Sequence, residues 1–157
     1  MLPVLLLAAA TAKLPPANPV PLDGSAEAAV MAPVNALFKA IAARDANAVA
    51  AVGLPEGGGA TIAMENPDGT RTITHRTWAE TSARFQPGPE RFEERLTDPA
   101  IEIDGDIAMV WGAYSFWING NIHHCGVDHF DLVRKDGNWK IANVTWSQRT
   151  LGCKAAQ

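Results

Sequence analysis

Apolar residues recur at helical spacing in the first part of the chain. Between residues 25 and 44 they stand three or four positions apart, which places them on one face of an α-helix: Val30, Val34, Leu37, Phe38 and Ile41. Ser25 precedes this run and is expected to cap the helix. Asp45 is a second capping residue, so residues 46–52 are predicted to form a short helix that ends at Gly53.

The pattern then changes to short strands and one more helix. Residues 60–65 and 70–74 are predicted to form a hairpin around an Asn-Pro-Asp-Gly turn. Thr77 and Glu80 have the spacing of a capping box, which predicts a third helix running toward Phe85.

The C-terminal half alternates in a way that is typical of long β-strands. Four segments carry this pattern: residues 92–103, with an interruption near Pro99, and residues 107–118, 122–134 and 139–149. Asn119-Gly120 is a strong hairpin turn between the second and third of them. The predicted helices come first in the chain and a meander of strands comes last. This order predicts an α+β fold, with helices packed on one curved sheet. The three strands from Ile107 to Ser147 are expected to form one wall of a small-molecule pocket.

Length and charge narrow the class of protein. A chain of 157 residues is long enough for one domain with its own core and short for two. The formal net charge is −4, and Lys and Arg are not clustered anywhere. Nucleic-acid binding is therefore not expected.

The N-terminus has the pattern of an export signal. The apolar run from Leu2 to Ala10 is too short for a permanent membrane anchor, and Ala10-Thr11-Ala12 is a small-x-small cleavage pattern. We predict a signal peptide at residues 1–12, a Pro-rich linker at residues 13–24 and a single domain at residues 25–153. The protein would then be periplasmic or secreted. The alternative is a buried or disordered N-terminal tail, since no Lys or Arg precedes the apolar run.

Export changes how the two cysteines are interpreted. In an oxidising compartment Cys125 and Cys153 are candidates for a disulfide. The alternative is two separate thiols, one of them buried and the other near the C-terminus. No sequence pattern around either residue indicates an activated thiolate.

The order of elements, a helix pair, a short hairpin, a third helix and a long meander, resembles the nuclear transport factor 2-like superfamily, also called the SnoaL-like group. The similarity spans residues 26–151, and its local markers are Ala43-Arg44-Asp45, Glu65-Asn66-Pro67, Asp128-His129-Phe130, Asp136-Gly137-Asn138-Trp139-Lys140-Ile141 and Thr145-Trp146-Ser147. The resemblance implies a cone-shaped roll: three N-terminal helices packed on a curved mixed, mainly antiparallel sheet, with a pocket between them. The superfamily includes isomerases, cyclases, dehydratases and domains without catalysis.

The ketosteroid isomerase branch of this superfamily gives a sharp comparison. Its mechanism uses a carboxylate base together with a Tyr and a neutral Asp that stabilise an oxyanion. The resemblance places Asp128 at the position of the neutral acid. Asn66 stands where the base is expected, and an amide cannot accept the proton. Leu37 or Phe38 stands where the Tyr is expected, so steroid-type isomerisation is not expected.

Strand alternation and the resemblance together predict which side chains face the pocket. Starting from Asp128, the predicted ligand-binding residues are Phe38, Asn66, Trp111, Ala113, Ser115, Phe130, Val144 and Trp146. Their apolar, aromatic character suits a ring-containing ligand, although some of these side chains are equally suited to the core. A single bulge would reverse every side chain beyond it.

The histidines are not expected to form a metal site, and His123 and His124 are expected to lie near the hairpin mouth, partly solvated. His124 is predicted to share the inner face with Asp128, whereas His123 and His129 are predicted on the outer face. A metal site would need ligands from both faces, so no metal and no cofactor are expected.

The sequence is compatible with three hypotheses of function. The leading one is an exported protein that binds a small, largely apolar molecule. The second is a cofactor-independent isomerase, cyclase or dehydratase that uses Asp128 as an acid, with His124 or His75 as a helper. The third is a non-catalytic module that forms a homodimer through its outer sheet face, where Tyr114, Phe116, Val127 and Ile141 are expected to cluster. An enzyme is distinguished from a binder by a second titratable group within hydrogen-bond reach of Asp128.

Overall fold

The computed structural model describes residues 25–154, so the predicted signal peptide and linker lie outside the described residues. The elements follow the predicted order: α1 (Ala26–Ala43), α2 (Ala46–Val52), β1 (Gly59–Glu65), β2 (Arg71–Thr77), α3 (Trp78–Ser82), β3 (Phe92–Asp104), β4 (Ile107–Ile118), β5 (Asn121–Lys135) and β6 (Asn138–Arg149).

The helices begin where the capping residues predict. The side chains of Ser25 and Asp45 accept hydrogen bonds from backbone N–H groups of the first turns of α1 and α2. Thr77 and Glu80 form the complete capping box of α3. This helix is shorter than predicted: it ends at Ser82, and the backbone N–H groups of Arg84 and Phe85 turn back onto its last carbonyls.

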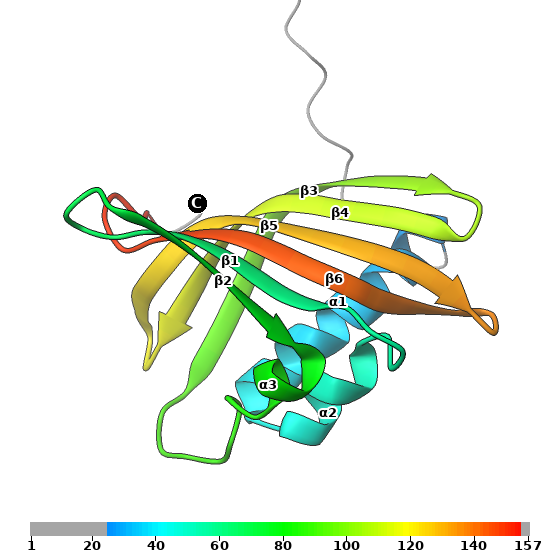
Figure 1. Ribbon diagram of the computed structural model, residues 1–157, viewed down its shortest axis with the longest axis horizontal. Coiled ribbons are helices and arrows are strands. Elements are labelled where there is room, and N and C mark those ends of the chain that lie inside the picture. The colour runs from blue at the N-terminus through cyan, green and yellow to red at the C-terminus, as the bar shows by residue number, and fades with distance from the viewer. Residues whose placement is uncertain (1–24, 155–157) are drawn as a thin grey trace, which may run out of the picture.

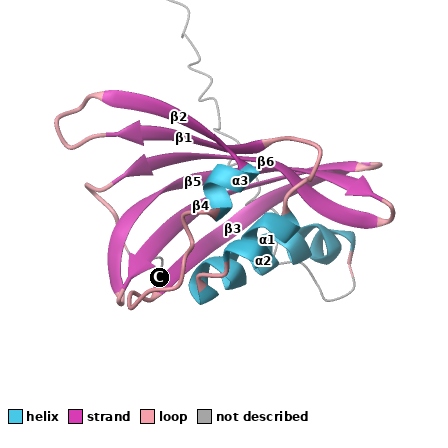
Figure 2. Ribbon diagram, turned by 60° about the horizontal axis from the view of Figure 1, so that its bottom comes forward, coloured by secondary structure: helices cyan, strands magenta, loops and turns pink. Residues whose placement is uncertain are grey.

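Six strands form one sheet in the order β2-β1-β6-β5-β4-β3. All neighbours are antiparallel except β1 and β6, which are parallel. The sheet bends around the helices, which lie together on its concave side (Figure 1), and Figure 2 shows the same layers from below. The predicted α+β roll with a mixed, mainly antiparallel sheet is confirmed.

The core lies between α1 and the sheet. Five residues of α1 are buried, at the helical spacing seen in the sequence: Val30, Val34, Leu37, Ala40 and Ile41. They pack with buried sheet residues, among them Phe130, Leu132 and Ile141. By length and hydropathy α1 would also suit a membrane span, but its apolar stripe is used here for the core.

A β-bulge sets the register between β4 and β5. Beyond the turn, Trp117 pairs with Ile122, but Phe116 pairs with His124, so His123 is the extra residue. A regular hairpin from this turn would pair Trp111 with Asp128; the bulge pairs Gly112 with Asp128 instead. Every side chain of β4 beyond the bulge is therefore on the opposite face from a regular hairpin.

Because of the same register shift, the side chains predicted on the outer face of the sheet are not all there. Tyr114 and Phe116 stand opposite Gly126 and His124 on the inner face, and Ile141 is fully buried in the core. The surface predicted for a dimer is therefore not built from these three side chains. A homodimer stays a prediction.

Cys125 and Cys153 form a disulfide, with their Cα atoms 5.7 Å apart. Cys125 pairs with Ser115 and Arg149, so the disulfide lies on the outer face of the sheet. It ties the segment after β6 to the back of β5.

Candidate functional site

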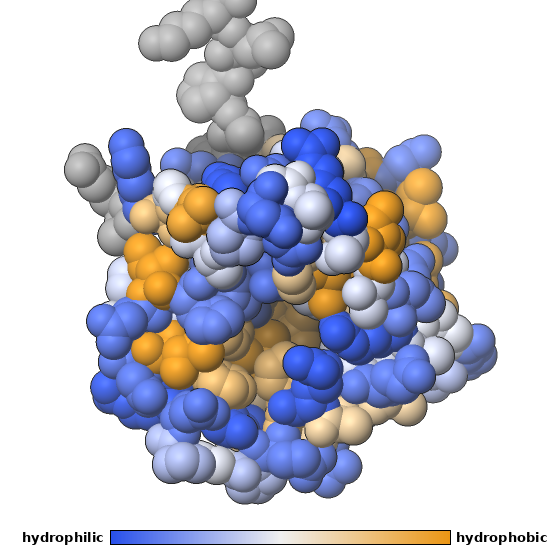
Figure 3. Space-filling model, turned by 60° about the vertical axis from the view of Figure 1, so that its left-hand side comes forward, coloured by the Kyte–Doolittle hydropathy of each residue, from blue (hydrophilic) through white to orange (hydrophobic). Residues whose placement is uncertain are grey.

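A cavity of about 320 Å³ opens between the helices and the concave side of the sheet. Figure 3 views the molecule from the side that is on the left in Figure 1, where an apolar hollow is rimmed by polar residues. Apolar side chains from α1, α3 and the strands form most of its wall: Leu37, Phe38, Ile41, Ile62, Met64, Trp78, Phe85, Phe92, Phe116, Ile118, Phe130, Val144 and Trp146. The size and composition are those of a small-molecule site.

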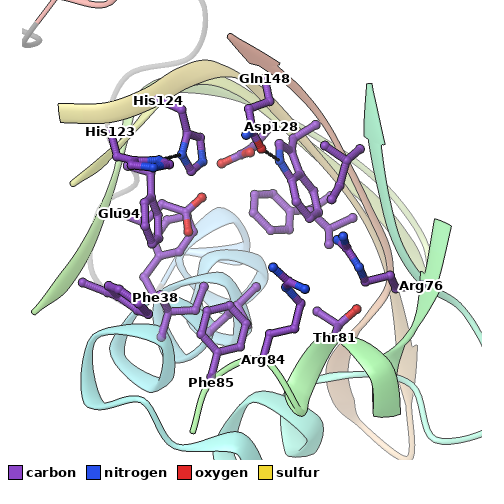
Figure 4. Close-up of a pocket in the computed structure, with 18 of the residues that line it drawn as sticks. Phe38, Arg76, Thr81, Arg84, Phe85, Glu94, His123, His124, Asp128 and Gln148 are labelled. Carbon is purple, nitrogen blue, oxygen red and sulfur yellow. Dashed lines mark hydrogen bonds between the residues drawn. The ribbon is translucent and has the colours of Figure 1, made fainter. Parts of the chain in front are cut away.

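Two carboxyl groups face this cavity side by side. Asp128 of β5 is only 2% exposed, and Glu94 of β3 is half-buried. Their side chains share a hydrogen bond, which requires a proton on one of them. Asp128 Oδ2 is buried and has no other partner among the described residues. Figure 4 shows both carboxyl groups turned toward the interior of the cavity.

Burial separates the roles of the two acids. Desolvation, the nearby Glu94 charge and the shared hydrogen bond raise the pKa of Asp128 well above its usual range. Desolvation also raises the pKa of Glu94, to about 7, although the hydrogen bond from Asp128 partly offsets it. Near neutral pH Asp128 is therefore the hydrogen-bond donor, and Glu94 exchanges between acid and base.

The two histidines of the bulge both line the cavity. Their Nδ1 atoms are 2.9 Å apart, and the ring of His124 stacks on Phe116 with centroids 4.8 Å apart. Burial, followed by the charge of the neighbouring His123, lowers the pKa of His124 to about 4. His124 is thus a neutral hydrogen-bonding group at pH 7. The prediction that His123 faces outward was wrong, because the bulge turns it toward the cavity mouth.

Tyr114 lies behind the acid pair without reaching the cavity. Its hydroxyl donates to the carbonyl of Ser147 at a distance of 3.1 Å. Burial, followed by the charges of Asp128 and Glu94, raises the pKa of this phenol above its usual range. The hydroxyl proton of Tyr114 is already donated to Ser147, so this side chain stabilises the fold and does not donate to a ligand.

Several predicted pocket residues lie where they were expected. Phe38, His124, Asp128, Phe130, Val144 and Trp146 all line the cavity. They come from α1, β5 and β6.

Four predicted ligand-binding residues do not line the cavity. Trp111 is 51% exposed, and Ala113 and Ser115 share its outer face because of the bulge at His123. Ser115 accepts a hydrogen bond from the indole N–H of Trp117. Asn66 lies in the β1–β2 turn and donates to the hydroxyl of Thr70. The structure therefore contradicts these four assignments.

Glu94 was missed by the sequence analysis, although a signal for it exists. In β3 the half-buried residues alternate with exposed ones, and Glu94 stands between Phe92 and Leu96 on the inner side. A carboxylic acid on the apolar side of an alternating strand is unusual and points to a functional site.

Among residues 25–154, no group of three or more His, Cys, Asp or Glu side chains is arranged to hold a metal ion.

Comparisons with known proteins agree on the fold. Residues 25–147 match the model of a family described as putative lumazine-binding. A protein of unknown function with a cystatin-like fold from Nostoc punctiforme is 11% identical, with a TM-score of 0.59 over 80% of this chain and 92% of that one. No curated protein matches this chain.

Two other solved structures are similar. An NTF2-like protein from Cytophaga hutchinsonii is 16% identical, with a TM-score of 0.59 over 80% of this chain and 99% of that one. A putative dehydratase from the NTF2-like family of Streptomyces avermitilis is 17% identical, with a TM-score of 0.57 over 78% of this chain and 94% of that one. These neighbours place the chain in the nuclear transport factor 2-like fold.

Proposed function

We propose that this chain, which belongs to the family described as putative lumazine-binding, binds a small, largely apolar molecule in the cavity between its helices and sheet. The observation that carries this proposal is the apolar cavity with Asp128 as a buried, protonated donor in its wall. A ligand that buries its apolar body there and forms a hydrogen bond with Asp128 Oδ2 satisfies the atom that is left unpaired. The aromatic wall and the family's description both favour a ring-containing molecule.

Blocking the cavity is expected to abolish binding of a neutral apolar probe. N-phenyl-1-naphthylamine, whose fluorescence rises in apolar surroundings, serves as the probe. Replacing Gln148, a half-buried lining residue of β6, by Trp should weaken its binding by at least about tenfold. Thr145→Trp is the matched control, since Thr145 is exposed on the same strand and does not line the cavity. Equal binding to both variants would show that the probe binds elsewhere.

The natural ligand requires a direct search. Mass spectrometry of the protein purified from its native compartment is expected to find a small molecule that is present with the wild type and absent with Gln148→Trp.

A second candidate function is acid–base catalysis, favoured by the Glu94–Asp128 pair. Asp128 can donate a hydrogen bond to a carbonyl oxygen while the Glu94 carboxylate removes a proton from the adjacent carbon. The proton then returns from Glu94 to the substrate. The likeness to a putative dehydratase agrees with such a role.

Proton exchange tests this second function. In D₂O the protein is expected to speed deuterium incorporation next to the carbonyl of 2-tetralone, followed by NMR. The rate should rise with pH through about 7, because the base form of Glu94 increases over this range. Glu94→Gln should lose at least about tenfold in rate. Equal exchange rates with wild type and Glu94→Gln would contradict the proposed catalysis and would leave the proposal of ligand binding unaffected.

Export is part of the same proposal. The disulfide between Cys125 and Cys153 supports it, since such bonds persist mainly in oxidising compartments. The predicted signal peptide at residues 1–12 is the sequence feature that would direct it.

A further inference from the structure

Two arginines reach into the cavity on the side of β2 and α3. Arg76 is half-buried at the end of β2, and Arg84 follows α3. Both line the cavity. Figure 4 shows their guanidinium groups turned inward near Thr81, on the other side of the cavity from His123 and His124.

Neither guanidinium group has a hydrogen bond or an ion pair with any residue in the range 25–154. Other arginines do pair with acidic side chains: Arg44, Arg71, Arg95 and Arg134. Glu80, whose pKa is affected by the charge of Arg76, already accepts hydrogen bonds from Thr77. The pKa of Glu80 is lowered first by hydrogen bonds from Thr77, then by the charges of His75 and Arg76. The five N–H donors of each guanidinium are thus free for a ligand.

A third unpaired donor stands at the same end of the cavity. Thr81 is buried, lines the cavity, and its Oγ1 has no hydrogen-bond partner among the described residues. Buried hydroxyl groups are normally paired, so a missing partner marks the place where a bound group would lie. Two cations and a hydroxyl donor around one space match the needs of an oxyanion.

The local charge differs from that of the whole chain. The protein has a formal net charge of −4, yet the arginine end of the cavity carries two positive charges. The acid pair, where Asp128 keeps its proton, adds at most the one negative charge of Glu94, which is fewer than the two positive charges. The site therefore attracts anions although the molecule as a whole repels them.

We infer that the ligand is an amphipathic organic anion, with an apolar ring-containing body, a carboxylate or similar anionic group held by Arg76, Arg84 and Thr81, and a neutral polar group at Asp128. This inference rests on the proposed function and specifies its ligand class. It does not depend on whether the site is catalytic.

A pair of probes that differ by one anionic group tests the inference. 1-Anilinonaphthalene-8-sulfonate is N-phenyl-1-naphthylamine with an added sulfonate. Wild type at low salt is expected to bind the sulfonate probe about tenfold more tightly than the neutral one, measured by fluorescence titration and calorimetry. Raising the salt concentration should reduce the ratio of the two affinities, because salt screens the attraction between the arginines and the sulfonate.

Variants separate the cavity arginines from surface charge. The double variant Arg76→Gln/Arg84→Gln is expected to lose the preference, measured as the ratio of its affinities for the two probes. Arg71→Gln is the control: Arg71 lies on β2, is 80% exposed and pairs with Glu65 outside the cavity, so this variant should keep the preference. Circular dichroism checks that each variant is folded.

The results separate the anionic character of the ligand from the existence of the apolar binding site. Equal affinity of wild type for the two probes would overturn the anionic ligand and leave the apolar binding site standing. A preference that survives in the double variant would also overturn it, since the anion would then be held elsewhere. Failure of both probes to bind would overturn the binding site itself, and the inference with it.

Discussion

Replacing Asp128 by asparagine is expected to stabilise the protein at pH 8 and to leave its stability near pH 4 almost unchanged. Desolvation and the neighbouring Glu94 raise the pKa of Asp128 well above 3.8 in the folded protein. The unfolded chain releases this proton near pH 4, whereas the folded chain keeps it. Between these values the folded state binds more protons, so wild-type stability falls as the pH rises. Asparagine has no proton to lose and removes this fall.

Glu94 gives the scale of the effect. A pKa moved from 4.5 to about 7 corresponds to about 3 kcal/mol above pH 7. Solvent that reaches the half-buried side chain reduces this to about 2 kcal/mol. Glu94→Gln should therefore stabilise the protein by about 2 kcal/mol at pH 8, and Asp128→Asn by more, because Asp128 is the more deeply buried group.

His124 acts in the opposite direction, so single variants must be compared with wild type at each pH. Its pKa of about 4 lies below the usual 6.5, and stability is therefore lost as the pH falls from 6.5 toward 4. Subtracting wild type from Asp128→Asn at the same pH removes this contribution. Urea unfolding followed by tryptophan fluorescence at pH 4, 6 and 8 measures the difference.

Asp136→Asn is the control for this experiment. Asp136 is exposed in the β5–β6 turn with a φ of 50°, a conformation that asparagine tolerates well. This variant shows what the replacement of an exposed carboxyl group does to stability at each pH. If Asp128→Asn showed the same pH dependence as this control, Asp128 would be ionised in the folded protein and the donor role assigned to it would be wrong.

Removing the disulfide is expected to cost about 3.5 kcal/mol. The bond closes a segment with a sequence separation of 28, and restricting a loop of this length in the unfolded chain gives a stabilisation of this size. The melting temperature of Cys153→Ser should fall by about 10 °C relative to wild type. Cys153 is the better site for substitution because Cys125 is buried.

Dithiothreitol provides the control. It should lower the melting temperature of wild type by a similar amount and leave that of Cys153→Ser unchanged. Both proteins should still bind N-phenyl-1-naphthylamine at 25 °C, since the disulfide is on the face of the sheet away from the cavity. If dithiothreitol did not change the melting temperature of wild type, the two cysteines would not be bonded in solution.

The fold was predictable from sequence because its signals are local. Capping residues Ser25, Asp45 and Thr77 mark three helix starts, and Asn119-Gly120 marks the central hairpin. The two N-terminal helices follow the predicted ranges to within a residue at each end.

The site was predictable only in part because it depends on register. β4 has apolar side chains on both faces, so its pattern alone does not tell which face is inside. A regular hairpin would have placed Trp111 beside Asp128, and one extra residue at His123 exchanged the faces. Nothing local in the sequence marks that bulge. Asp128 and Val144 were placed by the family resemblance, and Phe130 followed from Asp128 by strand alternation.

The acid pair illustrates a second limit. Glu94 and Asp128 are far apart in sequence, and β3 and β5 are not neighbours in the sheet, since β4 lies between them. Asp128 stands opposite Gly112 of β4, whereas Glu94 stands opposite Phe116 of the same strand, so the two acids are not in one cross-strand row. The pairing follows from the curvature of the sheet, which the alternation of single strands does not reveal.

The parallel pairing of β1 with β6 has a consequence for how the protein is made. Gly59 lies opposite Asn143, so the strands that close one wall of the cavity are 84 positions apart in the chain. During synthesis the first hairpin must wait for almost the whole chain to emerge before its partner exists. A chain exported before folding would therefore meet its ligand only at its destination, and the cavity would be empty of cytoplasmic molecules when it first closes.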